Sequence, residues 1–183
     1  VVADWTHLAN VGIQNLRLQF PDAPSFGHHL EQGYNGIYMT GVFDGWVRKL
    51  TIDSSDSGIL TDNAASLTIA DITTTGTRRA HYSVHVGAVH NVLVKDLKVE
   101  NPVIHPVSIN TRSTRSVFQR AVVDRDAIID QHSGSNHQNL FDQIEMHIDP
   151  KRGTDGWHYQ LWVGGGAPYW KPGHGLYNTL WNA

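Results

Sequence analysis

The chain has no cysteine and only two methionines among its 183 residues. The lack of cysteine excludes a disulfide framework, a thiolate metal site and a cysteine nucleophile. No apolar run approaches the roughly 18 residues that a membrane-spanning helix needs, so we expect no membrane partner. Charged residues make up 17% of the chain and hydrophobic residues 40%, which is enough to fill one core at this length. We therefore predict a single domain over residues 1–183.

Glycine, in contrast, is plentiful, and its 17 residues suit tight bends between strands rather than long helices. Within residues 91–99, the apolar side chains of Val92, Val94, Leu97 and Val99 form two strand alternations with a polar bend between them. A helix would instead need apolar residues at positions i, i+3, i+4 and i+7. This segment is therefore predicted to be a bent strand.

The same pattern recurs along the chain at a nearly fixed spacing. Its second apolar position falls at residues 13, 47, 69, 94, 119 and 141. Four of the five intervals between these positions are 22 to 25 residues long, and a fixed period of this length indicates a solenoid. The fifth repeat is predicted to fill the pattern with Val117, Gln119, Val122 and Asp124.

Residues 21–44 lengthen the first interval to 34 residues and form an insertion rich in turns. In a solenoid, such excursions often build the wall of a cleft. We interpret the His28–His29 pair within the insertion as an exposed loop pair without a role, with a place in such a wall as the alternative.

A second column of short alternations lies about ten residues before each of these positions. Its inward side chains are predicted to be Ile37, Ile59, Val84 and Ile109. Because side chains alternate along a strand, the residue after each of them faces outward. In the later coils these outward residues are predicted to form one polar ladder of His85, Asn110 and His132.

Together the two columns resemble the right-handed parallel β-helix of the pectate-lyase-like superfamily, with regular coils over residues 10–149. The resemblance implies an all-β fold of about six to seven coils and a habit of acting on polysaccharides. Residues 150–183 break the pattern and hold four of the six tryptophans, so we expect a last coil and an aromatic-rich cap there. No amphipathic capping helix precedes Val11. This leads us to expect a fragment of a longer chain, in which another segment or chain completes the N-terminal coil.

Charge is distributed unevenly, although the net charge is only −3. Residues 78–125 hold eight basic and three acidic groups, an excess of five positive charges. Such a belt attracts an anionic partner, and the alternative is that its side chains pair with neighbours on solvated turns. A nucleic-acid partner is not predicted, because no recognised motif is present and the net charge is negative.

The predicted ladder provides the candidate catalytic residues. Histidine is well suited to proton transfer near neutral pH, so His132 and His85 are candidates to take a proton from a substrate. Asp130 lies two residues before His132 on the same strand face and would orient its imidazole. The alternative is a purely structural polar ladder.

Candidate substrate-binding residues surround this ladder. Arginine and asparagine side chains bind carboxylates, and aromatic rings stack on sugars. The set consists of Asn110, Arg112, Arg78, Arg79, His81 and Trp162. No metal site and no cofactor are assigned. Two alternatives stay open: Ca²⁺ bound by Asp124, Asp126 and Asp130, and a transition metal bound by His85 and His132.

A lyase acting on uronic-acid glycans needs a group that neutralises the substrate carboxylate, a base for the C5 proton and an acid for the leaving oxygen. Tyr82 or a second histidine would supply the acid. We therefore predict a polysaccharide lyase, secreted to the extracellular space or the periplasm, whose partner is its acidic polysaccharide. One alternative is a glycoside hydrolase that uses two of Asp124, Asp126, Asp130, Asp142 and Glu145. The other is a non-catalytic glycan-binding or structural β-helix, such as a tail-spike-like module.

Overall fold

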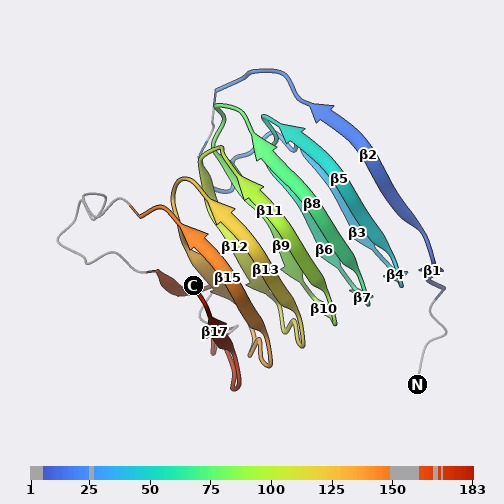
Figure 1. Ribbon diagram of the computed structural model, residues 1–183, viewed down its shortest axis with the longest axis vertical. Coiled ribbons are helices and arrows are strands. Elements are labelled where there is room, and N and C mark those ends of the chain that lie inside the picture. Colours follow the sequence, from blue (N-terminus) through green and yellow to red (C-terminus); the bar gives the residue numbers. More distant parts are fainter. Residues whose placement is uncertain (1–5, 25–26, 149–160, 167–168, 170) are drawn as a thin grey trace.

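The structure is a computed structural model that describes residues 6–24, 27–148, 161–166, 169 and 171–183. In it the chain winds repeatedly around one axis and forms a parallel β-helix (Figure 1). Strands of successive coils pair in parallel and build three sheets that run along the solenoid. Among the described residues, no helix has the length and apolar character needed to cross a membrane.

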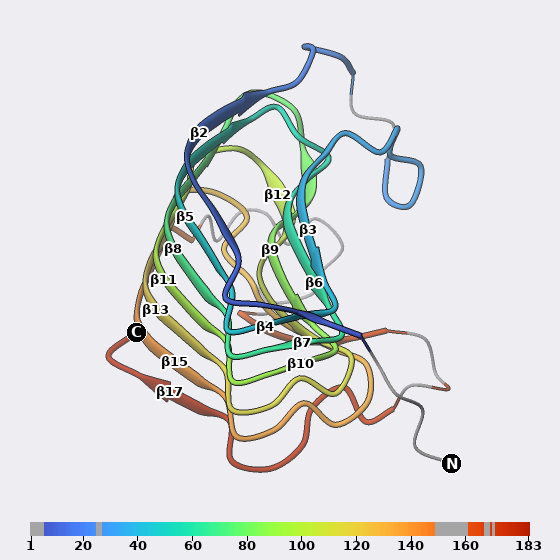
Figure 2. The same ribbon diagram turned by 90° about the vertical axis from the view of Figure 1, so that its right-hand side faces the viewer.

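The three sheets differ in the length and number of their strands. The seven-stranded sheet contains β2 (Gly12–Gln19), β5 (Trp46–Asp53), β8 (Thr68–Thr75), β11 (Leu93–Val99), β13 (Val117–Val123), β15 (Leu140–Met146) and β17 (Thr179–Trp181). The six-stranded sheet contains β3 (Asn35–Thr40), β6 (Ser57–Asp62), β9 (Ala80–Gly87), β12 (Val103–Asn110), β14 (Ile129–His132) and β16 (Trp162–Gly165). The four-stranded sheet contains β1 (Leu8–Ala9), β4 (Val42–Phe43), β7 (Ala64–Ala65) and β10 (Val89–His90). Figure 2 shows the two large sheets facing each other and the short strands closing the lower side.

The predicted fold class, an all-β right-handed parallel β-helix, is confirmed. The solenoid has about five coils, slightly fewer than the expected six to seven, because the four-stranded sheet contributes a strand to only four of them.

Vertical rows of buried side chains fill the space between the sheets. One row consists of Val47, Ile69, Val94, Phe118 and Phe141, each at most 1% exposed and each paired in register with the next. The last two rings stack with centroids 5.9 Å apart. Burying each such side chain contributes about 1.5 to 3 kcal/mol, so the apolar rows stabilise the stacking of the coils.

The polar bend predicted inside each strand of the seven-stranded sheet is a left-handed residue at the same place in successive coils. The residues are Asn15, Lys49, Asp71, Asp96, Arg120 and Gln143, with φ between 53° and 60°. A left-handed residue turns the strand and shifts its alternation by one position, which explains the interrupted apolar pattern. Asp96 and Arg120 also form a two-pronged ion pair across successive bends, at 2.7 and 2.9 Å.

The predicted register of the fifth repeat is wrong by one residue. Phe118, Ala121 and Val123 face the core in β13, whereas Gln119 and Asp124 were expected there. The left-handed bend at Arg120 must align with the bend at Asp96, and this alignment moves Phe118 rather than Gln119 into the apolar row.

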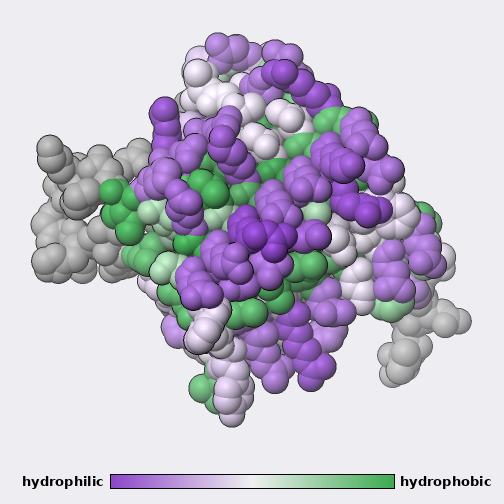
Figure 3. Space-filling view, in the orientation of Figure 1, coloured by the Kyte–Doolittle hydropathy of each residue, from purple (hydrophilic) through white to green (hydrophobic). Residues whose placement is uncertain are grey.

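The outer side of the seven-stranded sheet is mainly hydrophilic in the view of Figure 1 (Figure 3). Exposed Arg48, Lys98 and Arg120 lie on it, and the guanidinium of Arg48 lies 5.3 Å from the ring centre of Trp46. These residues are dispersed, and the dense group of histidines lies on the other large sheet.

The left-handed bends predict a matched pair of stability effects at Gln143, which is exposed and has φ of 56°. The Cβ of alanine makes the left-handed conformation as unfavourable as it is for glutamine, whereas glycine has no Cβ and adopts this conformation without a steric penalty. Gln143→Gly is expected to unfold at a higher denaturant concentration than Gln143→Ala, by about 1 kcal/mol in free energy of unfolding. Equal stability of the two variants would contradict the assigned bend.

Candidate active site

Ionisable side chains gather on the outer face of the six-stranded sheet, over β9, β12 and β14. Strand pairing places Asn110 beside His132, as predicted. His85, however, is level with Ser108 and Asp130 instead of Asn110. The predicted pairing of Asn110 with His132 is therefore confirmed, and the predicted pairing of His85 with Asn110 is wrong.

The error has a simple physical cause. Val84 pairs with Val107, whereas the sequence pattern matched it to Ile109. A shift of two residues keeps every side chain on the same face of a strand, because side chains alternate with a period of two. His85 therefore lies on the predicted face, displaced along the strand by one ladder position.

Asp130 is the charged centre of this face. Its side chain is fully buried, and its Oδ2 accepts a hydrogen bond of 2.7 Å from the hydroxyl of Ser108. Its Oδ1 contacts Nδ1 of His132 and lies 3.5 Å from Nδ1 of His105. A buried carboxylate requires such partners, because an unpaired charge away from water is strongly unfavourable. Asp130 therefore orients two imidazoles through their Nδ1 atoms.

The insertion between β2 and β3 brings two more histidines to this face, beside which it projects (Figure 2). His28 and His29 stack with ring centroids 3.9 Å apart. The Nε2 atoms of His28 and His81 are 3.2 Å apart, and the ring centroids of His81 and His105 are 5.3 Å apart. The ring of His105 in turn lies 4.8 Å from that of His132. We call His28, His29, His81, His105 and His132 the histidine cluster. The position of His28 and His29 agrees with the alternative interpretation of this pair, in which it forms part of the wall of a cleft.

A buried ion pair holds the insertion against the coil. Arg78 and Asp56 are only 3% and 4% exposed, and their side chains form a salt bridge of 3.2 Å. The other oxygen of Asp56 accepts hydrogen bonds from the backbone N–H groups of Gly33 and Tyr34, at 2.9 and 2.8 Å. Arg78 also donates to the carbonyl oxygen of Pro21, at the start of the insertion. The contacts of Arg78 are therefore structural, and its substrate-binding role stays a prediction.

Tyr82 lies inside the cluster, stacked on His81 with ring centroids 4.3 Å apart and 4.6 Å from the ring of His85. Burial raises the pKa of the Tyr82 phenol, the charge of Asp130 raises it further, and a hydrogen bond with Asn110 opposes the shift. The phenol is therefore protonated at neutral pH and available as a proton donor.

Burial favours the neutral form of three imidazoles at the site, those of His81, His85 and His105. Burial lowers the pKa of both His85 and His105 to about 4, although the charge of Asp130 opposes the shift. Burial also lowers the pKa of His81, and here Glu31 opposes it. Neutral imidazoles each keep one lone pair, which can accept a proton or bind a metal.

Two glycines make room for rings that lie flat on the sheet. A Cβ added at Gly87 would collide with the ring of His85, and one at Gly165 would collide with the ring of His132. Any side chain at these positions would therefore displace an imidazole of the site.

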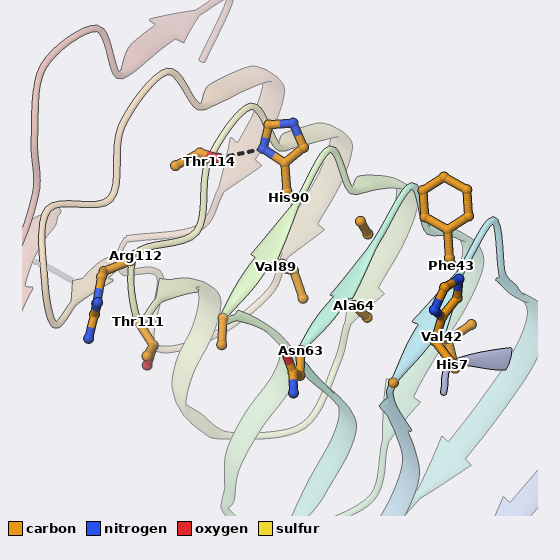
Figure 4. Close-up of a pocket in the computed structure, with 13 residues that line it drawn as sticks. His7, Val42, Phe43, Asn63, Ala64, Val89, His90, Thr111, Arg112 and Thr114 are labelled. Atoms are coloured by element: carbon orange, nitrogen blue, oxygen red, sulfur yellow. Dashed lines mark hydrogen bonds between the residues drawn. The ribbon is translucent and has the colours of Figure 1, made fainter. Parts of the chain in front are cut away.

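A groove lies on the four-stranded sheet. It has a volume of about 660 Å³, with Arg112 near one end and Phe43 near the other (Figure 4). A smaller pocket of about 170 Å³ contains Tyr82 and His85. The two cavities share Ala88 and Thr111 in their linings, so they lie next to each other.

The remaining predicted binding residues lie at different places. Arg112 is exposed and lines the groove. Arg79 is exposed and lies near His28 of the insertion. Burial and the neighbouring His29 lower the pKa of His28, and the positive charge of Arg79 lowers it further.

Trp162 has a structural position. Its ring packs edge-on against Phe141, with centroids 5.3 Å apart, and it is level with the buried Ile129. This position covers the end of the core and does not favour stacking on a sugar. Trp157 and Trp170 of the expected aromatic cap lie outside the described residues.

Within the described residues, two groups place three candidate metal ligands within 4.8 Å of one another. One consists of His28, His81 and His105, and the other of His105, Asp130 and His132. Neither contains Asp124 or Asp126, so the alternative of a calcium site made by three aspartates is not assembled. His85 is also in neither group.

His105, Glu31 and His28 were absent from the predicted set. The repeat could have predicted the position of His105, because His105 pairs with Tyr82 of the preceding coil. The insertion has no equivalent in the neighbouring coils, so the periodicity holds no signal for His28 or Glu31.

Comparison of the chain with protein-family models, with curated proteins and with solved structures finds no match. The pectate-lyase-like superfamily therefore remains a resemblance in the repeat pattern, and function has to be inferred from the chemistry of the site.

The buried ion pair predicts a large effect of a single substitution. Arg78→Gln leaves Asp56 charged, buried and unpaired, which is expected to lower the free energy of unfolding by about 3 to 5 kcal/mol. The matched control is Arg17→Gln, which removes an ion pair of the same kind, 3.0 Å long, whose arginine side chain is 62% exposed. That change should cost less than about 1 kcal/mol. Similar denaturation midpoints for the two variants would contradict the structural role of Arg78.

Proposed function

We propose that the protein is a secreted polysaccharide lyase that cleaves an acidic, uronic-acid-containing glycan by β-elimination. The observation that carries the proposal is the meeting of a phenol, several imidazoles and an amide on one face of the solenoid. Tyr82 would provide the acid and His132 the base, and Asn110 is a neighbour of both. Elimination needs an acid and a base to act on the same sugar residue.

In the proposed reaction, Nε2 of His132 takes the C5 proton of the uronate, while Asp130 holds Nδ1 of the same ring. The electrons of the C5–H bond form the C4–C5 double bond, and the bond from C4 to the glycosidic oxygen breaks. Tyr82 donates its proton to the leaving oxygen. Proton exchange with water then restores both groups.

The negative charge that develops on the uronate carboxylate has to be stabilised in the transition state. The amide of Asn110 can donate a hydrogen bond to it, and the positive charge of Arg79 lies near His28. Arg112 lies along the adjoining groove, where it would bind a carboxylate of a neighbouring sugar. The groove (Figure 4) adjoins the small pocket that contains Tyr82 and His85, so it would give the polymer a path away from these two residues.

A glycoside hydrolase is supported less well. Such an enzyme needs two carboxylates about 5 to 9.5 Å apart across the substrate. Asp142 and Glu145 lie on β15 of the seven-stranded sheet, whereas Asp130 lies on β14 of the six-stranded sheet. Asp130 is also fully buried beneath two imidazoles, which does not suit a direct role on a sugar.

The proposal is tested with a panel of alginate, pectic, glycosaminoglycan and ulvan-type polysaccharides. A lyase releases unsaturated uronates that absorb ultraviolet light, together with new reducing ends. Reducing ends without this absorbance would indicate a hydrolase, and binding without either product would indicate a non-catalytic module.

The catalytic assignment predicts that Tyr82→Phe lowers kcat about 100- to 10,000-fold on the active substrate, because the proton donor is lost. The matched control is Tyr177→Phe, whose side chain is 75% exposed and lines neither cavity. It should retain activity, and both variants should keep the far-ultraviolet circular dichroism of the parent. An active Tyr82→Phe variant would refute the assigned acid.

A further inference from the structure

Three imidazoles from different parts of the chain converge next to the proposed catalytic residues. We infer that His28, His81 and His105 form a binding site for one transition-metal dication of the Zn²⁺ class. His28 comes from the insertion, His81 from β9 and His105 from β12. Each of them can offer one nitrogen so that all three nitrogens lie within 4.8 Å of one another.

The spacing of the imidazole nitrogens agrees with tetrahedral coordination. The Nε2 atoms of His28 and His81 are 3.2 Å apart. Two nitrogens that bind one tetrahedral Zn²⁺ at about 2.0 to 2.1 Å are about 3.3 Å apart. A hydrogen bond between the two rings would give a similar distance, and Zn²⁺ binding by the parent and by variants of the two histidines distinguishes the two cases.

Carboxylates hold the far side of two of these rings. Nδ1 of His81 donates to Oε1 of Glu31 at 2.8 Å, and Nδ1 of His105 lies 3.5 Å from Oδ1 of Asp130. Metal-binding histidines commonly donate their other N–H to a carboxylate, which fixes the tautomer and makes the coordinating nitrogen more basic. Nε2 of His81 therefore presents its lone pair to the site, and the charge of Asp130 near Nδ1 favours the same tautomer for His105.

His105 supplies an independent observation. Its Nε2 atom is buried and has no hydrogen-bond partner among the described residues. Leaving a buried polar atom without a partner costs about 1 to 3 kcal/mol, and a metal ion would satisfy it. In the second group of candidate ligands, Asp130 already contacts Nδ1 of both His105 and His132, so it supports the rings instead of binding the metal.

The donor set determines the class of metal. Neutral imidazoles favour Zn²⁺, Co²⁺, Ni²⁺ or Cu²⁺, whereas Ca²⁺ and Mg²⁺ favour oxygen ligands. Three histidines leave a fourth position open, as in catalytic zinc sites. If the proposed lyase function holds, this open position would bind the substrate carboxylate. Carboxylate binding rests on the proposed function, whereas binding of the metal by the three histidines does not.

The test uses the full chain, freed of metal by a chelator, and Zn²⁺ as the probe, with binding measured by competition against a chromophoric chelator. We expect one Zn²⁺ per chain and at least a 100-fold loss of affinity in His28→Ala and in His105→Ala. Glu31→Gln should weaken binding about 10- to 100-fold by removing the support of His81. Excess Ca²⁺ should not displace Zn²⁺.

The matched control is His147→Ala, an exposed histidine 2.9 Å from Glu145 and 3.5 Å from Asp124, which also resembles a surface cation site. It should bind Zn²⁺ as the parent does. Circular dichroism and thermal unfolding confirm that the variants are folded. Absence of binding, or undiminished binding in folded His28→Ala and His105→Ala, would overturn the inference and leave a hydrogen bond between the rings.

The metal site and the lyase function can fail separately. Stoichiometric Zn²⁺ binding without product from any polysaccharide would keep the site and refute the lyase. Lyase activity that chelators leave unchanged, in a chain that binds no Zn²⁺, would keep the lyase and refute the site.

Discussion

Parallel stacking of the coils in register is the constraint on which the rest of the structure depends. Strands in one sheet lie about 4.8 Å apart, so outward side chains in successive coils come within reach of each other. Ser108 and Asp130 are 22 residues apart in sequence yet form a hydrogen bond of 2.7 Å. The buried rows that include Phe118 and Phe141 fix this register from inside, because a slip of one residue would exchange core and solvent faces.

Two buried carboxylates hold the side chains of the candidate site in place on this regular stack of coils. Asp130 fixes the imidazoles of His105 and His132 on the sheet, and Asp56 fixes the base of the insertion through Arg78. Neither carboxylate is exposed enough to act on a large substrate, at 0% and 4% of its surface. Their effect is to hold imidazoles and a phenol next to each other on one face of the sheet, a combination that suits proton transfer or metal binding.

The sequence was sufficient for the fold and for part of the site. The spacing of 22 to 25 residues predicted the solenoid, and the alternation around Asp130 and His132 placed both on the correct face. Periodicity alone did not fix the register, since the left-handed bend at Arg120 and the pairing of Val107 with Val84 each shift a coil. The path of the insertion follows from the Arg78–Asp56 ion pair, a contact between distant residues that no local pattern reveals.

We infer that the insertion and two neighbouring coils together form one metal-binding site on the six-stranded sheet. The most direct measurement is anomalous X-ray diffraction, at the zinc absorption edge, from crystals of the chain grown with Zn²⁺. We expect one strong peak about 2.0 to 2.1 Å from a ring nitrogen of each of His28, His81 and His105. A peak only at surface histidines such as His147, or an electron density map in which His28 lies away from His81, would contradict it.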